Sequence, residues 1–157
     1  MPNTLLQIPP PWLYNNTPLL TAELTTLSQA DSVNEVLEWL QQVRPAFVPT
    51  RFWLECQTAI IEGFDNVLQH AHQHLSSETA IALRLKVYRE GLEMEIWDYG
   101  EPFDLLSTLA QVPEKQTESA DHGRGLILMR RILDYISYTR TQDGRNYLRM
   151  IKALPLI

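Results

Sequence analysis

The chain has 157 residues and a formal net charge of −6, with 45% hydrophobic and 20% charged residues. This length fits one domain with a sizeable core, and an acidic balance without a basic stripe argues against a nucleic-acid partner. The single cysteine excludes an intrachain disulfide framework; no apolar run approaches the roughly 20 residues of a membrane span, and the N-terminus lacks signal-peptide features, so we expect a soluble, cytoplasmic protein.

The start of the chain is rich in proline, which forbids a regular helix. We therefore expect an extended arm over residues 1–18, packed through Trp12 and Leu13. Residues 19–157 contain no repeat and no linker-like stretch, and they are expected to form a single domain.

The first elements of that domain are a strand and two helices. Residues 19–27, LLTAELTTL, predict the strand. Asp31 or Ser32 can cap the first helix, because apolar residues then recur at helical spacing. A longer helix with an apolar face is expected over residues 50–75, starting directly after a proline.

The second half of the domain alternates between strands and helix. Residues 79–90 and 92–98 alternate apolar and polar side chains around a glycine-containing turn, which predicts an antiparallel hairpin. Residues 111–123 are polar without periodicity and predict a long loop, and a helix is expected over residues 125–133. A final hairpin is formed by residues 134–140 and 146–154. The order of these elements predicts one sheet with helices on one face.

The long helix contains the stretch EGFDNVLQHAH, in which Glu62, Asn66 and His70 are spaced by four. This spacing puts the three side chains on one helical face, away from the apolar one. A carboxylate and a carboxamide one turn apart can hold Mg²⁺, which needs only one or two protein oxygens when a nucleotide's phosphates supply the rest. The alternative is a solvated helix face without a ligand.

A second stretch, WDYGEPFD, contains Asp98 and Gly100. Asp98 shares parity with the apolar Leu92, Met94 and Ile96, so the period-two rule points its carboxylate toward the apolar side of the sheet. A carboxylate there needs a hydrogen-bond partner, and an adenine amino group would be one suitable donor. Gly100 lets the backbone approach a flat ligand. The alternative is that the strand ends before Asp98, which then lies in a turn.

A third stretch, ADHGRGLILM, places Gly123 and Gly125 before an apolar, helix-like run. Glycines there let a backbone approach a ligand closely, and a helix N-terminus favours a phosphate. The stretch is neither a Walker-type phosphate loop nor a Rossmann fingerprint, because no Lys-Ser or Lys-Thr follows and a third glycine is missing. The alternative is a glycine hinge without a ligand.

In this order, E-x-x-x-N-x-x-x-H-A, D-x-G-x-x-F-D and G-x-G-L resemble the N, G1 and G2 boxes of the GHKL ATPases, which include the histidine-kinase ATP domain. The full D-x-G-x-x-F-D form and the short length look most like the bacterial anti-sigma factor serine/threonine kinases. The resemblance covers about residues 20–152. It implies an α+β two-layer sandwich with a mixed, mostly antiparallel sheet and helices on one face.

The resemblance also implies roles for individual residues. Asn66 matches the position that coordinates Mg²⁺, and Glu62 matches the proposed general base. Asp98 matches the adenine-binding aspartate, with Gly100 beside the ring. The other residues that the resemblance places at the nucleotide are His70, Phe103, Lys115, Gly123, Arg124, Gly125 and Leu126.

Some positions depart from the family pattern. In the family, glycines such as Gly123 and Gly125 end a flexible ATP lid, and a further glycine or arginine often precedes them. Here Lys115 and Arg124 are the only cations in that segment. Asp65 stands where many relatives have a small or hydroxyl residue, and we expect its carboxylate to face water.

By resemblance, the chain binds ATP and Mg²⁺, phosphorylates a serine of an anti-sigma factor antagonist and sequesters a sigma factor, and relatives commonly form homodimers. A second hypothesis, of a different class, is a non-catalytic, nucleotide-dependent interaction switch of the same fold. A third is the ATP domain of a split histidine kinase, but the expected elements include no dimerising helical hairpin with an acceptor histidine.

Overall fold

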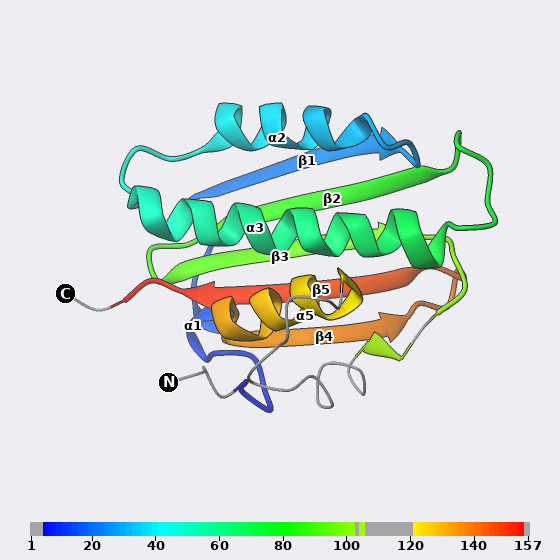
Figure 1. Ribbon diagram of the computed structural model, residues 1–157. Helices are drawn as coiled ribbons and strands as arrows, with labels where there is room; N and C mark the ends of the chain where they lie inside the picture. Colours follow the sequence, from blue (N-terminus) through cyan, green and yellow to red (C-terminus); the bar gives the residue numbers. More distant parts are fainter. Residues whose placement is uncertain (1–4, 103, 106–120, 156–157) are drawn as a thin grey trace.

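The computed structural model describes residues 5–102, 104–105 and 121–155. They form a five-stranded sheet with helices packed against one of its faces (Figure 1). In chain order, the elements are α1 (Trp12–Asn15), β1 (Leu20–Leu27), α2 (Ser32–Val43), α3 (Thr50–Asn66), the π turn η1 (Val67–Ala71), β2 (Ala80–Val87), β3 (Gly91–Asp98), α5 (Asp121–Ile132), β4 (Tyr135–Arg140) and β5 (Asn146–Ala153).

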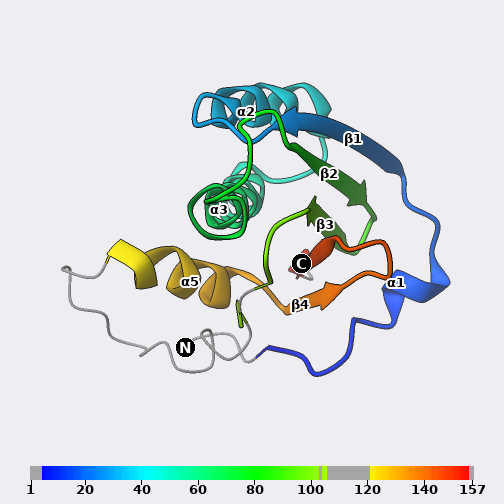
Figure 2. The same cartoon turned by 90° about the vertical axis from the view of Figure 1, so that its right-hand side faces the viewer.

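The strands pair in the order β1-β2-β3-β5-β4, and every pairing is antiparallel. The predicted α+β architecture and both predicted hairpins are therefore confirmed. The expectation of a mixed sheet is wrong for the described strands, because the two hairpins and the β3–β5 pair place only antiparallel neighbours side by side. Helices α2, α3 and α5 cover one face, and α1 lies on the opposite side, which we call the outer face (Figure 2).

Helix α3 lies close to the middle of the sheet because of a glycine. A β-carbon at Gly63 would come within 3.0 Å of Ile96 Cδ1 and of Leu148 Cδ2, two neighbours on strands β3 and β5. Phe64, the next residue, is completely buried in the same core. This packing holds the C-terminal half of α3 over the end of β3 and the start of β5.

The N-terminal arm is not extended throughout. Trp12–Asn15 form one helical turn, since Pro11 before them has a φ of −57° and proline is well tolerated at a helix start. The predicted packing is confirmed: Leu13 is buried with Tyr88 and Ile151, and the Trp12 ring lies 5.4 Å from that of Tyr88.

The long helix is shorter than predicted. It ends as an α-helix at Asn66 and continues only as the π turn to Ala71, instead of reaching Leu75. The chain turns there because His72, whose backbone N–H donates to the Val67 carbonyl at 2.7 Å, is drawn into the interior and is only 3% exposed. π turns are frequent at functional sites, and this one adjoins the residues described below.

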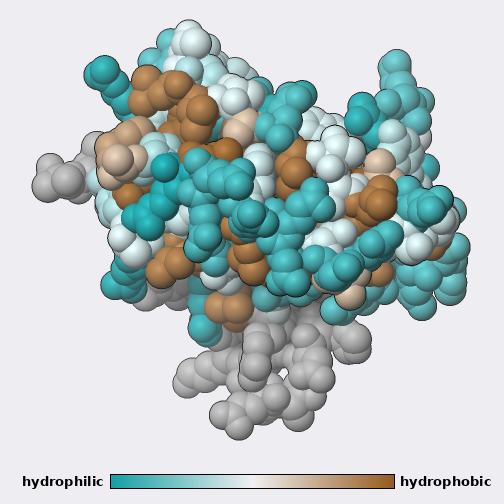
Figure 3. Space-filling model, turned by 90° about the horizontal axis from the view of Figure 1, so that it is seen from above, coloured by the Kyte–Doolittle hydropathy of each residue, from teal (hydrophilic) through white to brown (hydrophobic). Residues whose placement is uncertain are grey.

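None of the helices in the described ranges is long and apolar enough to cross a membrane. Seen from above, hydrophobic residues appear as separate patches between hydrophilic ones (Figure 3). This view therefore gives no sign of one continuous apolar face.

Candidate functional site

The three sequence motifs meet at one region of the molecule. The C-terminal end of α3, the end of β3 and the start of β5 lie at the same end of the sheet (Figure 1). Helix α5 lies beside α3 on the helix-covered face (Figure 2). Segments far apart in the sequence are thus neighbours in the fold.

Asp98 is the last residue of β3 and is only 2% exposed. Its Oδ1 accepts two hydrogen bonds, from the Gly100 backbone N–H at 2.8 Å and from Asn146 Nδ2 at 2.8 Å. The prediction that its carboxylate points to the apolar side is confirmed, and the alternative of a strand that ends before it is wrong. These two neutral donors satisfy a carboxylate whose burial would otherwise be costly.

Gly100 allows the segment after β3 to pack against the end of the long helix. A β-carbon at Gly100 would collide with the backbone carbonyl of Ala71, the last residue of the π turn. From the sequence, this glycine was predicted to make room for a ligand. In the structure, its close neighbour is the helix backbone, so the glycine fixes the distance between the Asp98 turn and α3.

His72 is a site residue that the sequence analysis missed. Its Nε2 accepts a hydrogen bond from the Tyr99 backbone N–H at 2.9 Å and lies 3.7 Å from Asp98 Oδ1. Because Nε2 accepts this hydrogen bond, the ring carries its proton on Nδ1, and burial lowers the pKa of His72 against the opposing effect of Asp98. Among the described residues, Nδ1 has no hydrogen-bond partner.

His70, which the sequence analysis favoured, lies elsewhere. It is exposed and belongs to the π turn, whereas Glu62 and Asn66 are half-buried in the regular part of α3. A π turn holds more residues than an α turn, so the spacing of four no longer places His70 directly below Asn66. The predicted stack of three side chains therefore ends at its second member.

Glu62 lies against the start of helix α5. A β-carbon at Gly125 would collide with the Glu62 carboxylate, so the carboxylate can occupy this position only because residue 125 is a glycine. Burial raises the pKa of Glu62, and the nearby Asp65 carboxylate raises it further. Asp65 does not simply face water as expected: it is half-buried, and this burial raises its pKa as well.

Helix α5 begins earlier than predicted, at Asp121. Gly123 and Gly125 therefore lie within its first turns and not in front of it. Leu126 is buried in the core. Phe103, Lys115 and most of the predicted loop lie outside the described residues, as does the side chain of Arg124.

Two residues of the last hairpin complete the surroundings of Asp98. Asn146, fully buried, donates from Nδ2 to the Gly100 carbonyl at 2.9 Å as well as to Asp98. Arg140 donates from one nitrogen to the same carbonyl at 2.7 Å and to Asn146 Oδ1 at 3.1 Å. Sequence reasoning missed both, since only the pairing of Asp98 with Asn146 across β3 and β5 brings them to the site.

Within the described residues, no three His, Cys, Asp or Glu side chains come together as a metal site. A cation at Asn66 would therefore need oxygens from a bound phosphate group. Such a shared coordination is usual for Mg²⁺ in nucleotide sites, so the residues present fit the predicted metal only together with a nucleotide.

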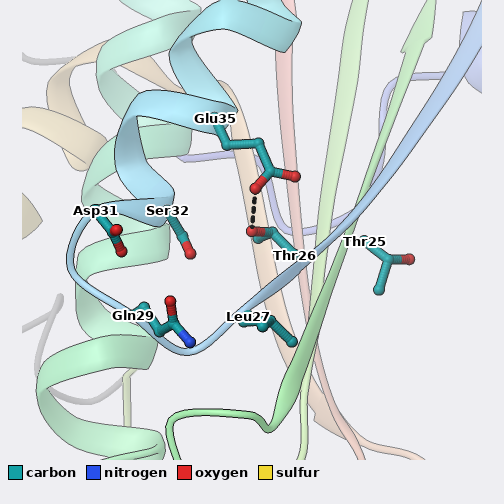
Figure 4. A pocket seen from close by; sticks show the side chains of 7 residues that line it. All are labelled: Thr25, Thr26, Leu27, Gln29, Asp31, Ser32 and Glu35. Atoms are coloured by element: carbon teal, nitrogen blue, oxygen red, sulfur yellow. Dashed lines mark hydrogen bonds between the residues drawn. The ribbon is translucent and has the colours of Figure 1, made fainter.

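A separate hollow of about 230 Å³ lies at the β1 edge of the sheet, between the end of β1 and the start of α2 (Figure 4). Its lining residues are Thr25, Thr26, Leu27, Gln29, Asp31, Ser32 and Glu35. Inside it, the Thr26 hydroxyl donates to the Glu35 carboxylate at 3.0 Å. It shares no residue with the three motifs and is not part of the candidate site.

Residues 26–152 match the model of the histidine kinase-like ATPase domain family. The chain therefore belongs to that family, and the predicted resemblance is confirmed. It is also similar to the crystal structure of the RsbU and RsbW domains of Rv1364c from Mycobacterium tuberculosis, with a TM-score of 0.51 and 12% identity. That match covers 88% of this chain and 34% of the other, so this chain spans about a third of its structural relative, and the likeness concerns the fold. No curated protein sequence matches the chain.

Proposed function

We propose that this domain is a serine/threonine protein kinase that uses ATP and Mg²⁺ to phosphorylate an anti-sigma factor antagonist and that also binds a sigma factor. The observation that carries the proposal is the contact between Glu62 and Gly125. It joins the motif proposed for catalysis to the motif proposed for phosphate binding, within a chain of the ATPase domain family.

The adenine would bind at Asp98. A buried carboxylate is an acceptor without donors of its own, and both hydrogen bonds from Gly100 and Asn146 reach Oδ1. Oδ2 is then the oxygen that can accept from the 6-amino group of adenine. Guanine has a carbonyl oxygen at that position, which a carboxylate would repel, so this site favours ATP over GTP.

Asn66 would hold Mg²⁺ through its side-chain oxygen, with phosphate oxygens as further ligands. Bound there, the ion would offset negative charge on the phosphates. Backbone N–H groups in the first turn of α5 would face the same phosphates, since a helix N-terminus favours anions. Asn66 lies one helical turn after Glu62, which supports a shared phosphate region for both residues.

Glu62 would act as the general base. In the proposed step, the serine Oγ of the protein substrate forms a bond to the γ-phosphorus, the bond from that phosphorus to the bridging oxygen breaks, and ADP leaves with the electron pair. The hydroxyl proton passes to Glu62. Its raised pKa brings the carboxylate closer to the working pH, where a general base is most effective.

A phosphoryl-transfer assay tests this proposal, with the antagonist protein of the same organism as acceptor. Glu62→Gln should lower the transfer rate by about 10²–10⁴-fold, because it removes the base, while ATP affinity stays close to native. Glu55→Gln is the matched control on the same helix: Glu55 pairs with Arg51 and Lys152, away from Gly125, and its change should leave transfer unaltered.

Gly125→Ala is a second test of the same geometry, since it displaces the Glu62 carboxylate without removing it. We expect transfer to fall in this variant as well. Equal transfer by native protein and Glu62→Gln would contradict the role of Glu62. Tight ATP binding without transfer to any antagonist would instead support the non-catalytic switch.

A further inference from the structure

We infer that Asn146 and Arg140 are positioning residues that hold the Asp98 carboxylate in the one orientation that reads the 6-amino group of adenine. This inference rests on the proposed adenine site at Asp98. It adds two residues of the last hairpin that none of the three sequence motifs contains, and it assigns base selectivity to them.

Asn146 links Arg140 to the Asp98 carboxylate. It is completely buried, and its amide nitrogen donates to Asp98 Oδ1 at 2.8 Å and to the Gly100 carbonyl at 2.9 Å. The same side chain thus touches both ends of the turn that follows β3. Rotation of Asp98 would break a bond to Asn146 and leave a buried donor without its acceptor, which is costly.

Arg140 fixes which way the Asn146 amide points. A guanidinium group can only donate, so the atom of Asn146 that meets Arg140 at 3.1 Å must be the amide oxygen, Oδ1. The Nδ2 group is then turned toward Asp98. Arg140 also donates to the Gly100 carbonyl at 2.7 Å, which ties the same turn a second time.

The consequence is that Oδ1 of Asp98 is already occupied by two donors, Gly100 N–H and Asn146 Nδ2. A carboxylate held in this way offers Oδ2 in a fixed direction. A freely rotating carboxylate could also accept from the N1 and 2-amino donors of guanine. Asn146 and Arg140 therefore favour adenine by restricting where Asp98 can point, without touching the base themselves.

The turn has a separate support on its other side. Gly100 packs against Ala71, and His72 accepts from the Tyr99 N–H. Because these contacts do not involve Arg140, which is exposed, loss of the Arg140 side chain should leave the fold intact. Arg140→Met is accordingly a gentler test than Asn146→Ala, which opens space in the core.

The experiment compares ATP with purine riboside triphosphate, an analogue that lacks the 6-amino group. Affinities are measured by calorimetry for native protein, Asn146→Ala, Arg140→Met and the control Arg145→Met. Arg145 lies on the same hairpin, but its side chain pairs with Asp143. Native protein and control should bind ATP about tenfold more tightly than the analogue, roughly the contribution of one charge-assisted hydrogen bond.

In Asn146→Ala and Arg140→Met, that preference should shrink toward one, with ATP weakened and the analogue nearly unchanged. A loss of equal size for both nucleotides in Arg140→Met would show a merely structural role and overturn the inference. Failure of the native protein to bind ATP would instead overturn the adenine site itself. Circular dichroism and melting temperature without nucleotide confirm that the variants compared are folded.

Discussion

Strand β3 has buried carboxylates on both of its faces, and the two faces differ in the partners that these carboxylates meet. Asp98 points to the helix-covered face and is 2% exposed. Glu93 and Glu95, of opposite parity, point to the outer face and are 2% and 4% exposed. The three side chains are equally hidden from water, so burial alone does not distinguish a site for a ligand from a structural cluster.

The partners do distinguish them. Within the part of the chain that the structure describes, Asp98 accepts hydrogen bonds from two neutral donors, both on Oδ1. Glu93 instead accepts from two nitrogens of Arg149, at 2.8 and 2.6 Å, and lies 3.5 Å from the Lys86 ammonium. Cations that neutralise a carboxylate and occupy its oxygens leave few free acceptor sites for a ligand. We call Glu93, Glu95 and the side chains that pair with them the outer cluster, and we interpret it as structural.

Glu95 completes the outer cluster. Its Oε1 accepts from the Tyr147 hydroxyl at 2.8 Å, and its Oε2 lies 3.4 Å from Arg84. The Tyr147 ring stacks on Trp97, with ring centroids 4.8 Å apart, and Arg84 lies over the Trp97 ring. Tyr147 and Arg84 thus lie against Glu95 as Arg149 and Lys86 lie against Glu93, and these side chains leave both outer-face carboxylates almost inaccessible to water.

The largest expected effect separates stability from binding. Arg149→Met removes both hydrogen bonds that Arg149 donates to the buried Glu93 and leaves only the Lys86 ammonium, 3.5 Å away, among its cations in the described residues, so the free energy of unfolding should fall by about 3 kcal/mol. ATP affinity should stay native, because the outer face does not reach Asp98. Urea denaturation and calorimetry measure the two quantities. A large loss of ATP affinity in folded protein would show that the two faces are coupled.

The next prediction is the opposite case, in which ATP affinity changes and stability does not. Asp98→Asn can keep its side-chain oxygen toward Gly100 and Asn146 but turns an amide donor toward the amino group of adenine. ATP affinity should fall by about 100-fold, with only a small change in melting temperature. The isosteric control is Glu93→Gln on the outer face, which should bind ATP normally. Native affinity in Asp98→Asn would remove Asp98 from the site.

The smallest effect concerns pH. Burial, together with a hydrogen bond shared with Glu93, raises the pKa of Glu95 from 4.5 to about 7, whereas hydrogen bonds from Glu95 and Arg149 outweigh burial and lower that of Glu93. A raised pKa in the folded state gives stability that is complete below pH 4.5 and is lost as the pH rises through about 7. Glu93 acts in the opposite sense, and its contribution is lost as the pH falls below 4.5.

Glu95→Gln should therefore be more stable than the native protein at pH 8 by about 2 kcal/mol, and the difference should vanish below pH 4.5. Denaturation at both pH values measures it. Parallel stability curves for the two proteins would contradict a protonated Glu95 at neutral pH.

The same strand shows what the sequence can and cannot predict. Period two placed Asp98 on the helix side, because strand parity is a local property. The identical rule put Glu93 and Glu95 on the opposite face but could not show that they are buried. Their cover comes from the neighbouring strands and depends on the register between them.

The residues of the candidate site also divide into those that the sequence predicted and those that it could not predict. The spacing of Glu62 and Asn66 predicted a shared face, since both lie in regular helix. His72 and Asn146 could not be found in this way, because a π turn and a pairing of distant strands bring them to Asp98. Local periodicity predicts which face a side chain occupies, whereas tertiary contacts decide which partners it meets there.

The most direct test of the central claim is a calorimetric titration of the native protein with ATP, repeated with GTP and without Mg²⁺. We predict saturable binding of ATP at one site, weaker binding of GTP, and tighter binding of ATP when Mg²⁺ is present. Absence of ATP binding at millimolar concentration, or equal affinity for ATP and GTP, would contradict an adenine site at Asp98.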